Sequence, residues 1–222
     1  MFLALLLAPR PALANGTCKL ALVLAIDVSG SVNGEEYRLQ MKGLSNALRA
    51  PDIANAIRFP GRSGIMATVV QWSGDPHQSQ IVPWAYLSSE QSIEAFARAV
   101  DEAERAYINF STAIGNALGF SASLFQTVPG ECARKVIDVS GDGRNNEGVE
   151  VQDMRASVLA AGITINGLAI IGPDEGLPNY YREEVIGGPQ AFVLSAKTFK
   201  DYPEVIRKKL LREIAPPLAS AR

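Results

Sequence analysis

The chain has 222 residues, of which 47% are hydrophobic and 20% are charged, and its formal net charge is −2. This length and balance are typical of one α/β domain with a sizeable core and exclude a largely disordered chain. The absence of a lysine- or arginine-rich run argues against nucleic acid as a main partner, and the single histidine, His77, excludes a multi-histidine zinc site.

The first fourteen residues have the pattern of an export signal. An apolar core at residues 2–8 is followed by Ala12-Leu13-Ala14, which has the small-x-small form of a cleavage site, although the usual preceding positive region is missing. A weakly packed N-terminus is the alternative. No other stretch is long and apolar enough to span a bilayer. We therefore expect a mature protein without a transmembrane segment that is periplasmic or secreted.

The two cysteines, Cys18 and Cys132, are expected to form an intramolecular disulfide, because oxidising compartments favour such bridges. Cys18 lies nine residues before Asp27, and Cys132 lies ten residues before Asp142. If both cysteines lead into neighbouring parallel strands, their thiols lie side by side at the same end of the sheet. Two unrelated buried thiols are the alternative.

Strand and helix patterns alternate along the chain. Residues 20–27 form an unbroken apolar run that ends in Asp27, which is typical of a strand buried on both faces. Pro83 interrupts a later strand and places it at a sheet edge. We expect strands at residues 20–27, 65–72, 81–87, 135–139, 163–171 and 191–194, and helices at residues 35–50, 90–106, 118–125, 149–161 and 198–214.

This alternation predicts an α/β fold, a doubly wound, mostly parallel six-stranded sheet with helices on both faces and one antiparallel edge strand. The domain is expected to cover residues 19–214, followed by a flexible tail at residues 215–222. In such sheets, ligands bind beyond the carboxyl ends of the strands. Asp27 ends the first strand and Asp142 follows the fourth, so both carboxylates are expected at the same edge of the sheet.

Three motifs at this edge together resemble the von Willebrand factor A (VWA) domain. They are D-V-S-G-S at residues 27–31, a threonine before G-N-A-L within residues 112–118, and D-G at residues 142–143. The resemblance covers essentially residues 19–214, including the order of strands and helices. More narrowly, the chain resembles a group of small exported bacterial VWA-like proteins whose function is not settled.

The resemblance implies a metal-ion-dependent adhesion site (MIDAS) for Mg2+, with Mn2+ or Ca2+ as alternatives. Ser29 and Ser31 would bind the cation through their hydroxyls, and Thr112 would supply a third hydroxyl directly or through water. Asp27 and Asp142 would act mainly through bound waters and by holding the serines. In the family, one coordination position stays open for a carboxylate from the partner. Hydroxyl ligands carry no formal charge, so the cation keeps its affinity for that carboxylate.

The two serines have another interpretation, because they lie shortly before a predicted helix. Serine is a favourable residue at a helix N-terminus. Val32, Asn33 and Gly34 nevertheless separate Ser31 from the predicted start at Glu35. We therefore favour the metal-ligand interpretation.

Thr112 and Asp142 each have a competitor nearby. Ser111 could replace Thr112 as the hydroxyl donor, but Gly115 lies three residues after Thr112, as the family spacing requires. Asp138 could replace Asp142, but it lies inside an apolar strand and is expected to be a hydrogen-bonded structural carboxylate.

The sequence departs from the family pattern just before Asp142. The family usually has a threonine or serine at that position, whereas this chain has Gly141. The connection at residues 172–188 also carries two tyrosines, Tyr180 and Tyr181, and an acidic pair. These side chains either set the choice of partner or belong to a short helix that packs its tyrosines.

The leading hypothesis for function is an exported, metal-dependent protein-binding module that captures an acidic group of an unidentified protein partner. The first alternative is a metal-dependent hydrolase or phosphatase that uses Asp27 as nucleophile. Such chemistry usually needs a second nearby acid and a neutralising cation, whereas Ser29 stands two residues after Asp27. The second alternative is a structural VWA domain with a vestigial metal site. We favour the non-enzymatic binding module.

Overall fold

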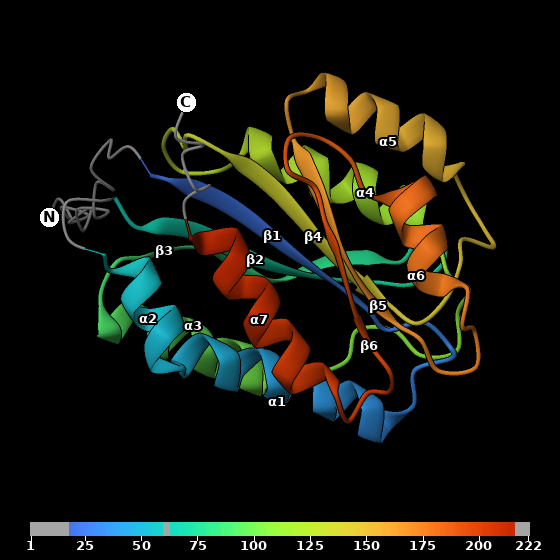
Figure 1. Ribbon diagram of the computed structural model, residues 1–222, viewed down its shortest axis with the longest axis horizontal. Coiled ribbons are helices and arrows are strands. Elements are labelled where there is room, and N and C mark those ends of the chain that lie inside the picture. Colours follow the sequence, from blue (N-terminus) through green and yellow to red (C-terminus); the bar gives the residue numbers. More distant parts are fainter. Residues whose placement is uncertain (1–17, 60–62, 216–222) are drawn as a thin grey trace, which may run out of the picture.

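The computed structural model describes residues 18–59 and 63–215 and shows one six-stranded sheet (Figure 1). The strand order is β3-β2-β1-β4-β5-β6, and only β3 runs antiparallel to its neighbour. This confirms the predicted doubly wound sheet with one antiparallel edge strand. The strands are β1 (Leu20–Asp27), β2 (Ile65–Trp72), β3 (Gln78–Leu87), β4 (Lys135–Gly141), β5 (Thr164–Ile170) and β6 (Val193–Ala196).

Helices cover both faces of the sheet (Figure 1). One face carries α1 (Gly34–Arg49), α2 (Pro51–Ile57), α3 (Glu90–Glu102) and α7 (Tyr202–Ile214). The other face carries α4 (Ile114–Ser123), the 3-10 helix η1 (Leu124–Gln126), α5 (Val151–Ala160), α6 (Leu177–Tyr180) and the π-helix η2 (Tyr181–Val185). The predicted signal segment at residues 1–14 and the tail beyond residue 215 lie outside the described residues.

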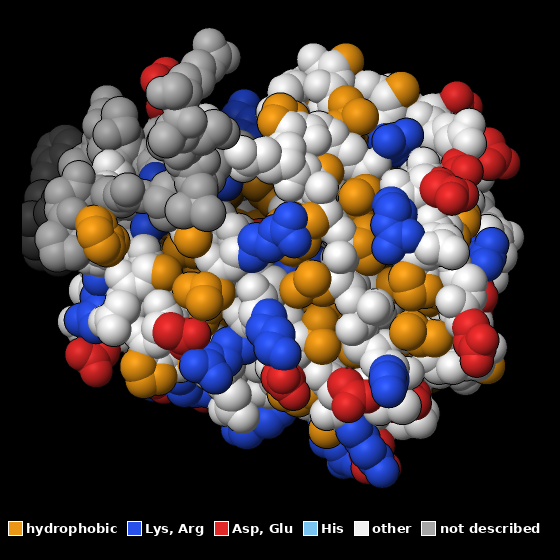
Figure 2. Space-filling model, viewed as in Figure 1, with side chains coloured by type: hydrophobic (Ala, Val, Ile, Leu, Met, Phe, Trp, Pro, Cys, Tyr) orange, Lys and Arg blue, Asp and Glu red, His pale blue; other side chains and the backbone are white. Residues whose placement is uncertain are grey.

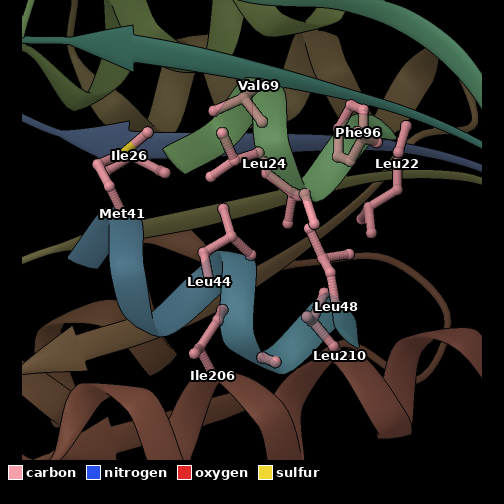
Figure 3. Close-up of a cluster of buried hydrophobic side chains, with 14 of the residues drawn as sticks. Leu22, Leu24, Ile26, Met41, Leu44, Leu48, Val69, Phe96, Ile206 and Leu210 are labelled. Atoms are coloured by element: carbon pink, nitrogen blue, oxygen red, sulfur yellow. The ribbon is translucent and has the colours of Figure 1, made fainter. Parts of the chain in front are cut away.

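β1 is the centre of the molecule because it pairs with β2 on one side and β4 on the other. All eight of its residues are buried, and its side chains alternate between the two faces. The larger side chains point toward α1 and α7 (Figure 3). The labelled members of this cluster include Leu22, Leu24, Ile26, Met41, Leu44, Leu48, Ile206 and Leu210. Two helix layers therefore hold β1 rigidly, and with it the position of Asp27.

A disulfide joins Cys18 to Cys132, as predicted. The two residues form an isolated parallel bridge just before β1 and β4, which are neighbours in the sheet. The disulfide therefore clamps the end of these strands that is opposite Asp27 and Asp142. No helix in residues 18–59 and 63–215 is long and apolar enough to cross a membrane.

Several element boundaries differ from those expected. Helix α3 ends at Glu102, rather than continuing to residue 106, and the chain then reaches Thr112 without regular secondary structure. Helix α7 begins at Tyr202, because Thr198 instead donates through its backbone N–H and its hydroxyl to the Asp201 carboxylate, 2.9 Å away in both cases. Helix α5 ends at Ala160, close to the expected end at residue 161, and Gly162 follows with a φ of +71°, a conformation that commonly ends helices.

Candidate metal centre

Asp27 is the most deeply buried member of the predicted site. Its Oδ1 accepts a 2.7 Å hydrogen bond from the Ser29 backbone N–H. Its carbonyl oxygen accepts a 3.1 Å bond from Gln40 Nε2 on α1. The second carboxylate oxygen, Oδ2, is buried and has no hydrogen-bond partner among the described residues. Leaving such an oxygen unpaired is costly, so Oδ2 marks a place where a further polar group is expected.

Ser29, Ser31 and Asp142 form a continuous hydrogen-bonded chain. The hydroxyls of Ser29 and Ser31 lie 3.1 Å apart, and Ser31 Oγ donates to Asp142 Oδ1 at 2.7 Å. Ser29 is buried, whereas Ser31 is exposed. This chain joins the loop after β1 to the loop after β4 across 111 residues of sequence. The structure thus brings together the two carboxyl strand ends that were expected to converge.

Thr112 approaches from a third loop, which precedes α4. Its backbone N–H donates to Asn146 Oδ1 at 2.8 Å, and the Asn146 N–H returns a 2.9 Å bond to the Thr112 carbonyl. A Cβ atom built on Gly143, the residue after Asp142, would lie 3.5 Å from Thr112 Oγ1. The Thr112 hydroxyl therefore lies beside the loop that carries Asp142. The competing Ser111 is exposed, and its carbonyl accepts a bond from Ser73 Oγ at 3.1 Å.

The loop after β1 is held by backbone contacts as well as by its side chains. Gly30 N–H donates to the Phe110 carbonyl at 2.8 Å. One guanidinium nitrogen of Arg105 donates to the carbonyls of Val28 and Ser29 at 2.8 and 2.9 Å. Sequence analysis did not identify Arg105, because nothing in its local pattern indicates that it reaches a loop 76 residues away. These contacts fix the backbone that carries the two serines.

The capping alternative for the two serines is wrong. Helix α1 begins at Gly34 and is capped by Asn33, whose side-chain oxygen accepts from Glu35 and Glu36 at 2.9 and 3.0 Å. Glu36 Oε2 accepts in return from the Asn33 N–H at 2.8 Å. This reciprocal capping box satisfies the helix start. The hydroxyls of Ser29 and Ser31 are therefore free for the chain that ends at Asp142.

Asp138 is a structural carboxylate, as expected, rather than a member of the site. It lies within β4 and forms a buried ion pair with Lys209 of α7, with 2.6 Å between Nζ and Oδ1. Lys209 also pairs with Glu213 Oε1 at 2.6 Å. These contacts lie on the α7 face of the sheet and leave Asp142 as the carboxylate at the strand end.

Burial disfavours the ionised forms of both carboxylates of the site. Burial, with a contribution from the Asp142 charge, raises the pKa of Asp27 to about 7 from 3.8. Burial also raises the pKa of Asp142, although the Ser31 hydrogen bond opposes this change. A nearby cation would favour both charged forms. A cation placed here would therefore lower both pKa values.

The residues present fit a hard divalent cation. The predicted set contains two carboxylates and three hydroxyls, and small oxygen donors of this kind suit Mg2+. In residues 18–59 and 63–215, no group of three or more His, Cys, Asp or Glu side chains forms a metal cluster. Any cation at this edge would therefore depend on serine and threonine hydroxyls. Asp27 Oδ2 is buried and has no hydrogen-bond partner among the described residues. A cation, or a water molecule bound to a cation, would satisfy this atom.

The Tyr181 hydroxyl also lies in this region, and sequence analysis did not predict its position beside Asp27. A Cβ built on Gly141 would lie 2.7 Å from Tyr181 Oη and 2.7 Å from Asp27 Oδ2. The tyrosine hydroxyl therefore occupies space that a threonine or serine at position 141 would need. Both oxygen atoms are buried and unpartnered among the described residues. Gly141, where the family usually has threonine or serine, was the sequence feature that indicated free space at this position. It did not indicate that the Tyr181 side chain fills that space.

Solved structures with a VWA domain share this fold. The chain is similar to proximal thread matrix protein 1 from the mussel byssus with a zinc-occupied MIDAS motif, with a TM-score of 0.63 and 18% identity. That match covers 87% of this chain and 47% of the mussel chain. A von Willebrand factor type A structure from Catenulispora acidiphila gives a TM-score of 0.61 and 17% identity, covering 89% of this chain and 43% of that chain.

A third solved structure matches over nearly its whole length. The conserved hypothetical protein BatB from Bacteroides thetaiotaomicron gives a TM-score of 0.58 and 16% identity, covering 87% of this chain and 98% of BatB. The chain spans less than half of the mussel and Catenulispora structures. At these identities the similarity concerns the fold, and it confirms the predicted VWA architecture.

No curated protein matches this sequence closely enough to extend the comparison. A family profile described as "Protein of unknown function (DUF1194)" matches residues 17–218. That span is nearly the whole 222-residue chain and includes all the residues of the candidate metal centre. The chain therefore belongs to the DUF1194 family, and its fold is that of a VWA domain.

Proposed function

We propose that this protein is an exported binding module that uses a divalent cation, Mg2+ in the first instance, to capture an acidic group of a protein partner. The observation that carries the proposal is the hydrogen-bonded chain from Ser29 through Ser31 to Asp142, at the same strand edge as the unpartnered Asp27 Oδ2. In this proposal Thr112 supplies the third hydroxyl.

The donor set favours a hard cation that retains affinity for anions. Magnesium requires oxygen ligands and usually keeps several waters. The zinc-occupied motif in the mussel protein supports a divalent ion in this fold, and Mn2+ or Ca2+ are the alternatives to Mg2+ here. When bound, the cation would supply a Lewis-acidic position for an incoming carboxylate. Ser31 is exposed and Asp142 is partly exposed, so a partner can approach from solvent on this side.

The geometry argues against the phosphatase alternative. Asp27 is fully buried, and one of its carboxylate oxygens is held by the Ser29 N–H, so its carboxylate is poorly placed for in-line attack on a substrate. Lys209, a buried lysine, is paired with Asp138 and Glu213 on the α7 face and is not available to neutralise a phosphoryl group. A nucleophilic carboxylate needs both access and charge neutralisation.

Export is part of the proposal. The disulfide between Cys18 and Cys132 is consistent with an oxidising compartment. The apolar segment at residues 2–8, with its small-x-small site at residues 12–14, supports the same interpretation from sequence. We therefore place the mature protein in the periplasm or outside the cell.

The direct test is calorimetric titration with Mg2+ and Mn2+. We expect one site, with binding strongly weakened in Ser31→Ala and lost in Asp142→Ala. Ser123→Ala is the matched control, because Ser123 is an exposed serine whose hydroxyl donates to the carbonyl of Phe120 in its own helix. Equal metal binding by wild type, Ser31→Ala and Asp142→Ala would contradict the proposed site.

A second experiment separates partner capture from catalysis. Immobilised protein is exposed to an envelope extract with Mg2+ or with a chelator, alongside the Asp142→Ala variant. Retention of a partner only by the wild type with Mg2+ supports the binding module. Turnover of a generic phosphate ester that disappears in Asp27→Asn would support the enzymatic alternative instead.

A further inference from the structure

A cavity of about 1040 Å3 lies at the opposite edge of the sheet from the candidate metal centre. It is bounded by the beginnings of β4 and β5, by the end of α7 and by the loop before β6. Figure 2 views the molecule from the α7 side, where lysine and arginine side chains alternate with hydrophobic ones. None of the residues proposed for the metal centre lines this cavity.

The walls of the cavity are largely apolar. Val136 of β4, Leu159 of α5, Ile163 and Phe192 all line it, together with small side chains of the loop before β6. The guanidinium carbon of Arg212 lies 3.9 Å from the centre of the Phe192 ring, so one wall is a stacked cation–aromatic pair. A volume near 1000 Å3 lies at the upper end of the range for small-molecule sites.

Three cations line the same cavity: Arg134, Lys135 and Arg212. None of them forms an ion pair with another described residue within salt-bridge distance. Arg134 is oriented by a 2.7 Å hydrogen bond from its guanidinium to the Glu213 carbonyl. The cavity thus combines an apolar interior with unpaired positive charge.

One buried carboxylate, Glu213, also lines the cavity. Its Oε1 accepts from Lys209 at 2.6 Å and from Asn166 at 3.1 Å, while Oε2 has no hydrogen-bond partner among the described residues. Lys209 also pairs with Asp138, so the buried set of Lys209, Asp138 and Glu213 carries at most one net negative charge. The three positive charges of Arg134, Lys135 and Arg212 exceed this negative charge, so the cavity lining as a whole favours an anionic ligand.

We propose that this cavity binds an anionic amphiphile: a ligand with an apolar body and one acidic head group. The body would lie against Leu159, Ile163 and Phe192, while the head group would pair with Lys135 and Arg212. A wholly apolar ligand would leave the cations unmatched, and a small inorganic anion would leave the apolar walls in contact with water. The assignment does not depend on the metal centre.

The test uses the fluorescent anion 8-anilinonaphthalene-1-sulfonate, which joins aromatic rings to a sulfonate, on purified protein in chelator. We expect a single saturable site from which dodecanoate displaces the dye, whereas dodecanol, of the same chain length, displaces it much more weakly. In the double variant Lys135→Gln with Arg212→Gln, dodecanoate affinity should fall about tenfold, since charge-assisted hydrogen bonds are lost.

Two further variants keep the test interpretable. Ala133→Phe enlarges an exposed lining residue and should reduce dye binding by narrowing the cavity. Arg38→Gln removes an exposed arginine of α1 away from the cavity and should leave affinity unchanged. Circular dichroism checks that each variant is folded.

The proposal is overturned by any of three results. Non-saturable dye binding would indicate general hydrophobic exposure. Equal displacement by dodecanoate and dodecanol would show that the cations do not select the ligand. Dye binding that begins only after removal of residues 216–222 would identify the occupant as the chain's own C-terminal segment.

Discussion

The Tyr181 hydroxyl offers the sharpest test of how the buried side of the proposed metal centre is organised. It is fully buried and has no hydrogen-bond partner among the described residues. An unpaired buried hydroxyl costs about 1–3 kcal/mol. Removing it in Tyr181→Phe should therefore raise the free energy of unfolding of the metal-free protein, by about 1 kcal/mol at the low end of that range.

The same substitution should have the opposite effect on metal binding. Tyr181 Oη and Asp27 Oδ2 both lie 2.7 Å from the position of a Cβ built on Gly141, so they share one small space. In the proposed metal-bound state, the hydroxyl donates to the Asp27 carboxylate or to a water held there. Loss of one hydrogen bond to a charged group is worth about 1.5–3 kcal/mol, so we expect Mg2+ affinity to fall about tenfold or more.

The assay is urea unfolding of wild type and variant, each in chelator and in saturating Mg2+. Tyr180→Phe is the matched control, because the Tyr180 hydroxyl accepts a 3.2 Å bond from the Asn145 N–H and is therefore satisfied. That variant should lose stability in both conditions. The reasoning fails if Tyr181→Phe destabilises the metal-free protein as Tyr180→Phe does, or if Mg2+ stabilises Tyr181→Phe as strongly as wild type.

The remaining predictions concern pH, a buried charge and the disulfide. The pKa of Asp27 is raised to about 7 in the folded state, so the folded protein binds the proton more tightly than the unfolded chain does. Metal-free stability should therefore rise as pH falls from 7 toward 4, and Asp27→Asn should flatten part of that rise in denaturant titrations. Mg2+ affinity, followed by calorimetry, should weaken over the same range as protons compete. Lys209→Met should cost about 3–5 kcal/mol in urea unfolding, because it leaves two buried carboxylates unpaired, whereas Lys208→Met, at an exposed ion pair, should cost at most about 1 kcal/mol. Replacing Cys18 and Cys132 together by serine should cost about 4 kcal/mol, and a reductant should then no longer affect the melting temperature.

The arrangement of the sheet and the convergence of the site could be predicted because they depend on local patterns. The apolar run that ends in Asp27 identified β1, and the alternation of strands with helices fixed which strands are parallel. Once the strands are parallel, their carboxyl ends share an edge, and Asp27 must lie near Asp142. The same logic at the opposite edge placed Cys18 beside Cys132.

The parts that could not be predicted depend on contacts between distant segments. Nothing near Arg105 indicates that its guanidinium holds the Val28 and Ser29 carbonyls. Tyr181 was recognised as a tyrosine that a short helix could bury, but its position beside Asp27 depends on the absence of a side chain at Gly141. The predicted end of helix α3, at residue 106, was wrong for a similar reason. The chain leaves α3 at Glu102, and backbone N–H groups and side chains of the following segment bind outside the helix, as when the Ala106 N–H donates to Gln71 Oε1 at 2.7 Å.

The charge balance of the proposed metal centre explains why neutral hydroxyls matter there. Asp27 and Asp142 are close enough that the charge of one raises the pKa of the other, yet the donors between them, Ser29 and Ser31, are neutral hydroxyls. A divalent cation placed among these groups would meet at most two negative charges, one of them on a carboxylate that is already committed to the Ser29 N–H. With a third carboxylate in place of Ser31, the site would hold the cation more tightly but repel an acidic partner. The hydroxyl chain therefore favours a cation that is held by the domain and still attractive to an anion, and this balance is what the proposed capture of a partner's carboxylate requires.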